Sequence, residues 1–144
     1  MAALAFEGVE YYQEVTGSIS QDTFGLDPYD KLATINNCAA LLLTCRNFAF
    51  YHCWGALDVP QLHEQQGEEL VSVILSLSEA LIEKSNIPGF SFLFPLRVAG
   101  TFAMTQSRRE EVTHLLRRIH DQGFVFSRWV QEDLNQLWRY VGNS

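Results

Sequence analysis

A histidine near the end of a long apolar segment is the side chain in this sequence best placed for acid–base chemistry. His52 follows Cys45 by seven residues and Cys38 by fourteen, which places it on one stripe of a helix. Tyr51 adjoins it in sequence and points about 100° away. An imidazole between a tyrosine and Trp54 can donate or accept a proton near neutral pH. We predict His52 and Tyr51 as catalytic residues, with a core histidine bonded to a carbonyl as the alternative.

Polar side chains and aromatic rings within apolar segments predict a ligand pocket. An unpaired buried guanidinium is too costly, so Arg46 must reach water, a carboxylate or a polar group of a ligand. Arg97 is predicted either to brace two helices by a structural contact or to contact an anionic ligand. Aromatic rings gather in segments 48–54 and 90–102, and they suit a flat apolar ligand as well as plain packing. The predicted substrate-binding residues are Arg46, Asn47, Arg97, Phe50, Trp54 and Phe94.

Neither a metal site nor a cofactor site is predicted. The three cysteines are Cys38, Cys45 and Cys53, and their spacing of seven and eight does not suit zinc, whose ligand pairs lie two to four apart. Carboxylates at positions 64, 68 and 69 are typical of a solvated helix start, with a hydrated Mg²⁺ as the alternative. No glycine-rich phosphate loop is present.

The first long helix expected in the chain has a clear start. Asp27 can cap it and Pro28 suits its first position, and no proline or glycine follows until Gly55. Because residues 28–54 are apolar nearly all round, we expect this helix at the centre of a bundle. Residues 1–26 predict a short helix followed by a loop.

The second half of the chain predicts further helices. Residues 61–84 carry an apolar stripe, and 90–102 predict a loop entering a short buried helix, with Pro95 in its first turn. Ser107-Arg-Arg-Glu110 has the spacing of a capping box. The last helix is expected over 126–140, with inward residues Trp129, Val130, Leu134, Leu137 and Trp138. We therefore predict an all-α, single-domain bundle of five or six helices, with residues 1–26 as an N-terminal helix and loop and 27–144 as the helical domain.

Composition and charge narrow the classes of partner. The 144 residues contain 17 acids and 10 Lys or Arg, for a net charge of −7, which argues against direct nucleic-acid binding. The longest purely apolar run has six residues, too few to span a membrane, and the N-terminus has no basic stretch typical of a signal peptide. An odd cysteine count predicts an intracellular protein, in the cytoplasm or the nucleus. Six of the ten basic residues follow position 107, and a complementary interface in a homodimer is a further prediction.

Several segments resemble a known family. They are Phe94-Pro-Leu-Arg-Val-Ala-Gly100, Ser107-Arg-Arg-Glu110, Leu115-Leu-Arg-Arg-Ile119, Gly123-Phe124 and Asp133-Leu-Asn-Gln-Leu-Trp138. Together they resemble the C-terminal part of the fungal-specific transcription factor domain, the helical regulatory region of zinc-cluster regulators. The resemblance covers about residues 30–144. Members of that family carry a six-cysteine zinc cluster that binds DNA, and no cysteines here have that spacing. The resemblance thus implies a regulatory-type helical fold without its DNA-binding domain.

Two functions follow as expectations. Aromatic segments around His52, in a chain that starts with Met and lacks the zinc cluster, favour a small cofactor-free enzyme of fungal specialised metabolism. It would act as a cyclase, an isomerase or a pericyclic-type catalyst by holding an apolar polyketide or terpenoid in a reactive pose. The alternative is a non-catalytic regulatory, interaction or ligand-binding module derived from a fungal transcription factor.

Overall fold

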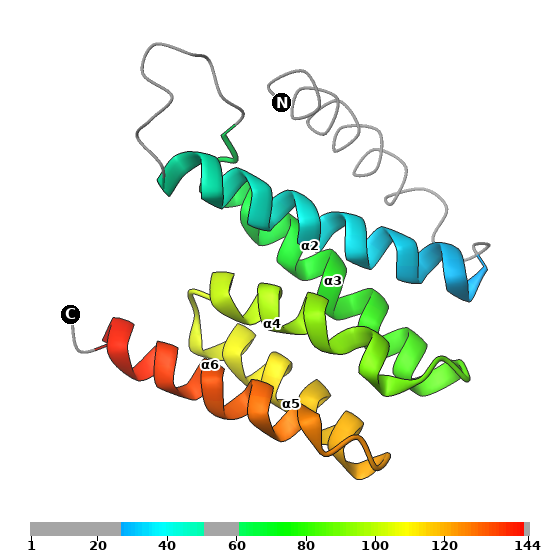
Figure 1. The fold of residues 1–144 in the computed structure, drawn as a ribbon. Coiled ribbons are helices and arrows are strands. Elements are labelled where there is room, and N and C mark those ends of the chain that lie inside the picture. The colour runs from blue at the N-terminus through cyan, green and yellow to red at the C-terminus, as the bar shows by residue number, and fades with distance from the viewer. Residues whose placement is uncertain (1–26, 51–60, 143–144) are drawn as a thin grey trace.

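The described part of the chain is all helical, as predicted. The structure is a computed structural model that describes residues 27–50, with side chains to position 48, and residues 61–142. In these ranges it contains five α-helices, one 3₁₀ turn and no strand. Consecutive helices run in roughly opposite directions (Figure 1). The elements are α2 (Pro28–Phe50), α3 (Glu64–Lys84), the 3₁₀ turn η2 (Gly89–Phe92), α4 (Leu93–Phe102), α5 (Gln106–Asp121) and α6 (Phe126–Gly142).

The helix starts follow local capping chemistry. Asp27 Oδ1 accepts a hydrogen bond from the Tyr29 amide at 2.9 Å, so the predicted start at Pro28 is confirmed. The predicted capping box at Ser107 is wrong, because α5 begins earlier. Its N-cap is Thr105, whose hydroxyl accepts from the Arg108 amide at 3.3 Å. Both residues can cap a helix, and Thr105 is the one whose backbone is extended.

The short helix α4 occupies the centre of the described bundle. It contacts each of the other four α-helices, and its Leu96 and Ala99 are fully buried. The expectation of a central helix at 28–54 is therefore corrected. Helix α2 packs mainly on α3 and α4, and several of its residues, including Ala33 and Leu43, are exposed. Composition alone misplaced α2, because small and apolar residues also occur on exposed helix faces.

Helices α4 and α6 run in the same direction (Figure 1), and side-chain contacts join them. Arg97 Nη2 lies 2.7 Å from Asp133 Oδ2, and the Trp138 indole nitrogen donates to the Gly100 carbonyl at 3.0 Å. Because Gly100 has no side chain, the fully buried Leu134 of α6 can pack directly against the backbone of α4.

The core connects all five described helices. Val130 and Leu134 point inward as predicted, but Trp129 is 68% exposed, and its predicted inward position is wrong. No described helix is both long and apolar enough to cross a bilayer. The largest fully buried side chains include Ile35, Leu42, Leu70, Ile74, Phe92, Leu96, Leu116, Ile119 and Leu134.

Candidate functional site

The predicted acid–base residues lie outside the described part of the chain. Tyr51, His52 and Trp54 fall between the two described ranges, and the side chain of Phe50 is not described. The catalytic assignment of His52 and Tyr51 therefore stays a prediction.

The two polar residues predicted on α2 are both exposed, and one of them lines a pocket. The guanidinium carbon of Arg46 lies 5.1 Å from the centre of the Phe102 ring, a cation–π contact that joins α2 to the end of α4. Arg46 makes no ion pair with another described residue. Asn47 does not line the same pocket.

Arg97 and Phe94 lie on the outer face of α4 and do not line the pocket beside Arg46. Besides its contact with Asp133 through Nη2, Arg97 donates through Nε to the same carboxylate oxygen at 2.9 Å. Both side chains of this pair are about half exposed. The predicted bracing of two helices by Arg97 is thus confirmed, and the structure does not bring Arg97 and Arg46 into one site.

The pocket beside Arg46 has a volume of about 450 Å³ and lies where three helix ends meet. The last turns of α2 form one wall, the start of α3 another, and the segment that follows α4 the third. Gly67 leaves open space on the α3 side of the pocket. A Cβ built on Gly67 would meet no atom closer than a Leu42 carbon, at 4.0 Å. The lining residues are Leu42, Cys45, Arg46, Gln61, Leu62, His63, Glu64, Gly67, Glu68, Phe102, Met104 and Thr105.

The charged groups of this pocket are only partly paired. Glu68 Oε1 lies 3.4 Å from Arg108 Nε. The other oxygen, Oε2, is enclosed and accepts no hydrogen bond from any described residue. An enclosed carboxylate oxygen without a donor is unfavourable, and a donor on a ligand would relieve that cost.

The thiol of Cys45, which lines the pocket, is buried. Burial raises the pKa of Cys45 above its ordinary value, so this side chain stays a neutral thiol near pH 7 and acts as apolar surface. No group of three His, Cys, Asp or Glu side chains in the described ranges is arranged to hold a metal ion. The pocket thus combines apolar walls with the Arg46 guanidinium, two carboxylates and the His63 imidazole.

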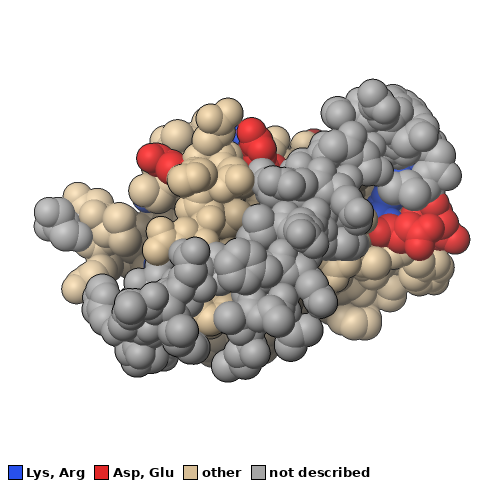
Figure 2. Space-filling view, turned by 90° about the horizontal axis from the view of Figure 1, so that it is seen from above, with Lys and Arg blue, Asp and Glu red and all other residues tan. Residues whose placement is uncertain are grey.

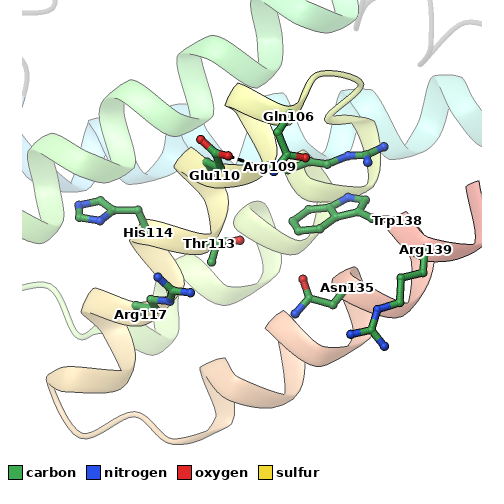
Figure 3. A pocket seen from close by; sticks show the side chains of 9 residues that line it. All are labelled: Gln106, Arg109, Glu110, Thr113, His114, Arg117, Asn135, Trp138 and Arg139. Carbon is green, nitrogen blue, oxygen red and sulfur yellow. Dashed lines mark hydrogen bonds between the residues drawn. The ribbon is translucent and has the colours of Figure 1, made fainter. Parts of the chain in front are cut away.

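A second hollow, between α5 and α6, was not predicted from the sequence. It has a volume of about 550 Å³, and all but one of its lining side chains are polar or charged (Figure 3). Arg109 stacks over the Trp138 ring at 5.6 Å and donates to the Ala103 carbonyl at 3.2 Å. No ion pair joins Arg117 or Arg139 to another described residue. The lining residues are Gln106, Arg109, Glu110, Thr113, His114, Arg117, Asn135, Trp138 and Arg139.

One feature of the sequence, the clustering of arginines beyond position 107, could have indicated this second hollow. All six basic residues beyond position 107 lie on α5 and α6, on the side of the bundle opposite α2 (Figure 1). Where described residues are visible on the α2 side, acidic surface exceeds basic surface (Figure 2). Guanidinium groups in an open groove suit carboxylates or phosphates. Of these two hollows, the pocket beside Arg46 has the more apolar lining, which is typical of small-molecule sites.

Comparison with known proteins gave no match: no protein-family model, no curated protein and no solved structure is similar to this chain. The likeness to the fungal-specific transcription factor domain therefore remains a resemblance carried by its sequence segments. The chemistry of the site rests on its own geometry.

Proposed function

We propose that this protein binds an apolar small molecule in the pocket where α2, α3 and α4 meet. The observation that carries the proposal is an apolar hollow of about 450 Å³ with the Arg46 guanidinium held over the Phe102 ring at its edge. Pockets of roughly 300–1,000 Å³ with mainly apolar walls and a few polar groups are typical of ligand sites.

The lining also indicates the chemistry of the ligand. Leu62 and Met104 offer apolar surface for a ring-rich body, and Phe102 offers an aromatic face. Arg46 makes no hydrogen bond to another described residue, so its N–H groups can donate to a carbonyl or an acidic group. We infer a ligand with an apolar body and at least one hydrogen-bond acceptor.

Binding of 1-anilinonaphthalene-8-sulfonate, an apolar fluorescent probe with an acidic group, tests the proposal. Gly67→Leu fills the pocket and should abolish the saturable fluorescence increase. Arg46→Gln removes the charged donor and should weaken binding at least tenfold, because a hydrogen bond to a charged group contributes about 1.5–3 kcal/mol.

Matched controls separate this pocket from other surfaces. Ser76→Leu adds the same side chain at an exposed position of α3, and Arg117→Gln removes a guanidinium in the other groove. Trp129→Gln removes an exposed ring. All three should bind the probe as the parent does. Binding that survives Gly67→Leu, or that falls equally in the controls, would refute the proposal.

Turnover of the bound ligand is a second proposal, supported by an imidazole at the pocket edge. His63 lines the pocket, and the predicted catalytic His52 and Tyr51 follow α2 in the sequence. A cyclase or isomerase would need one such acid–base group besides the positioning supplied by the walls. The test is incubation with apolar polyketide and terpenoid substrates. Conversion that is lost in His52→Ala or His63→Ala supports an enzyme, whereas probe binding without any conversion supports the non-catalytic binding module.

A further inference from the structure

Five large apolar side chains are exposed on one side of the described bundle, and we call them the aromatic strip. They are Phe90 at 60% exposure, Phe94 at 49%, Val125 at 67%, Phe126 at 65% and Trp129 at 68%. Single exposed apolar residues are common, but a contiguous group of this size marks an interaction surface.

The parallel course of α4 and α6 makes the strip contiguous. Arg97 and Asp133 touch, Phe94 lies about one turn before Arg97, and Trp129 lies about one turn before Asp133. Helices α4 and α6 run in the same direction (Figure 1), so one turn back from the Arg97–Asp133 pair along each helix puts Phe94 and Trp129 on the same side of the bundle.

The turn between α5 and α6 adds the other members. Phe124 packs edge-on against Phe90, with ring centres 6.0 Å apart and planes at 65°. Val125 and Phe126 follow directly in the chain, at the start of α6. η2, α4, the turn and α6 therefore contribute to a single apolar surface.

The charges around the strip are already neutralised. Arg97 pairs with Asp133, and Arg128 Nε lies 3.3 Å from Glu132 Oε1. A strongly charged partner thus finds no unpaired opposite charge in these flanking pairs, whereas an uncharged apolar surface fits. The same surface on a second copy has that property, and a two-fold interface requires a patch that complements itself.

The exposed area suits a weak dimer. Aromatic side chains offer roughly 150–250 Å² each, so the partly exposed strip contributes about 600 Å² per copy. Two copies together would bury about 1,200 Å², which is the lower limit of specific protein–protein interfaces.

We propose that the aromatic strip is the interface of a homodimer of this chain. The sequence predicted a homodimer through complementary charges, whereas the structure points to apolar contact between identical strips. At this lower limit of interface size we expect weak association. The inference is independent of the ligand pocket, because the two share no residue.

Sedimentation velocity of the full chain, from about 1 to about 200 μM, tests the dimer. We expect a monomer at the low end and a dimer at the high end. The double variant Phe94→Gln/Trp129→Gln should raise the dissociation constant at least tenfold. The control variant Tyr29→Gln/Leu43→Gln removes two side chains that are 72% and 39% exposed outside the strip, and it should dimerise as the parent does.

Salt provides a readout that does not depend on any variant. A dimer held by the strip should persist or tighten between about 0.05 and about 0.5 M NaCl, whereas one held by complementary charges should dissociate. Far-UV circular dichroism checks that the double variant remains helical. If the double variant does not fold, the single variant Phe126→Gln is used in the same sedimentation experiment. A chain that is monomeric throughout, or a dimer unaffected by the strip variants, overturns the proposal. A monomer that co-sediments with phosphatidylcholine vesicles would also overturn it and assign the strip to a lipid surface.

Discussion

At the scale of single residues, two helical glycines occupy opposite kinds of space. A Cβ on Gly100 would lie 2.5 Å from Leu134 Cδ1, and because Leu134 is fully buried, relieving this clash requires the core around it to shift. We predict that Gly100→Ala destabilises the protein by about 1–3 kcal/mol, the usual cost of overpacking a core. Urea unfolding at neutral pH measures the change.

Gly67→Ala is the matched control for this substitution. A Cβ on Gly67 meets nothing closer than 4.0 Å, and alanine has the higher helix propensity. We expect Gly67→Ala to stabilise the protein by about 0.5–1 kcal/mol. If Gly100→Ala stabilised the protein as Gly67→Ala is expected to do, the close packing of α6 on α4 at Gly100 would be wrong.

The buried thiol of Cys38 predicts a pH dependence. Burial raises its pKa from an ordinary value near 9 to about 11, because the thiolate would lose its hydration. The unfolded chain therefore releases this proton first as pH rises. The thiol's contribution to stability is complete below about pH 9 and is lost progressively as pH approaches about 11.

The loss should amount to about 1 kcal/mol at about pH 10. Urea unfolding of the parent and of Cys38→Ala at about pH 8 and about pH 10 measures it, and the comparison cancels the titration of Lys and Tyr. We expect the parent to lose more stability than the variant over this interval. Equal losses would contradict a buried neutral thiol at position 38.

At the scale of elements, the start of α5 yields a prediction with a built-in control. The Thr105 hydroxyl accepts from the Arg108 amide, while Ser107 lies one residue inside the helix start at Gln106 and is exposed. Thr105→Ala should therefore destabilise the protein by about 1 kcal/mol, and Ser107→Ala by only a few tenths. Thermal unfolding followed by circular dichroism distinguishes the two, and the opposite order would restore Ser107 as the cap.

The same helix shows what the sequence could and could not determine. Apolar periodicity located α2, α3, α5 and α6, because one face of each must be buried, whereas α4 was expected from its apolar content and from Pro95. The N-cap of α5 lies two residues before the predicted one. Thr105 and Ser107 are equally competent caps, and tertiary packing decides between them. The exposure of Trp129 could not be predicted, since a ring on a helix flank looks the same in sequence whether it meets the core or solvent.

The candidate site was predictable only in part. Arg46 was recognised because a guanidinium in an apolar helix needs a partner, and the structure supplies the Phe102 ring. The other walls of that pocket come from the start of α3 and the end of α4, which only the tertiary arrangement brings together. Phe94 and Arg97 were assigned to the same site, but their position on α4 places them on its outer face.

At the scale of the whole molecule, contacts of α4 with every other described helix predict cooperative unfolding. Neither α2–α3 nor α5–α6 can bury its inner face without α4, so loss of α4 should release both pairs. Leu96→Ala, at the fully buried centre of α4, should lower the free energy of unfolding by about 2–5 kcal/mol. Leu43→Ala, on the partly exposed face of α2, should cost less than about 1 kcal/mol.

Two probes report on different parts of this bundle. In a Trp54→Phe background, tryptophan fluorescence comes from Trp129 and Trp138 of α6 alone, whereas far-UV circular dichroism reports on all helices. We expect the two urea transitions to coincide in this background and to shift together when Leu96→Ala is added, because α6 cannot remain packed once α4 is lost. Fluorescence that persists after a large part of the helicity has gone would show that α5 and α6 form a separate folding unit, and the central role of α4 would then be wrong.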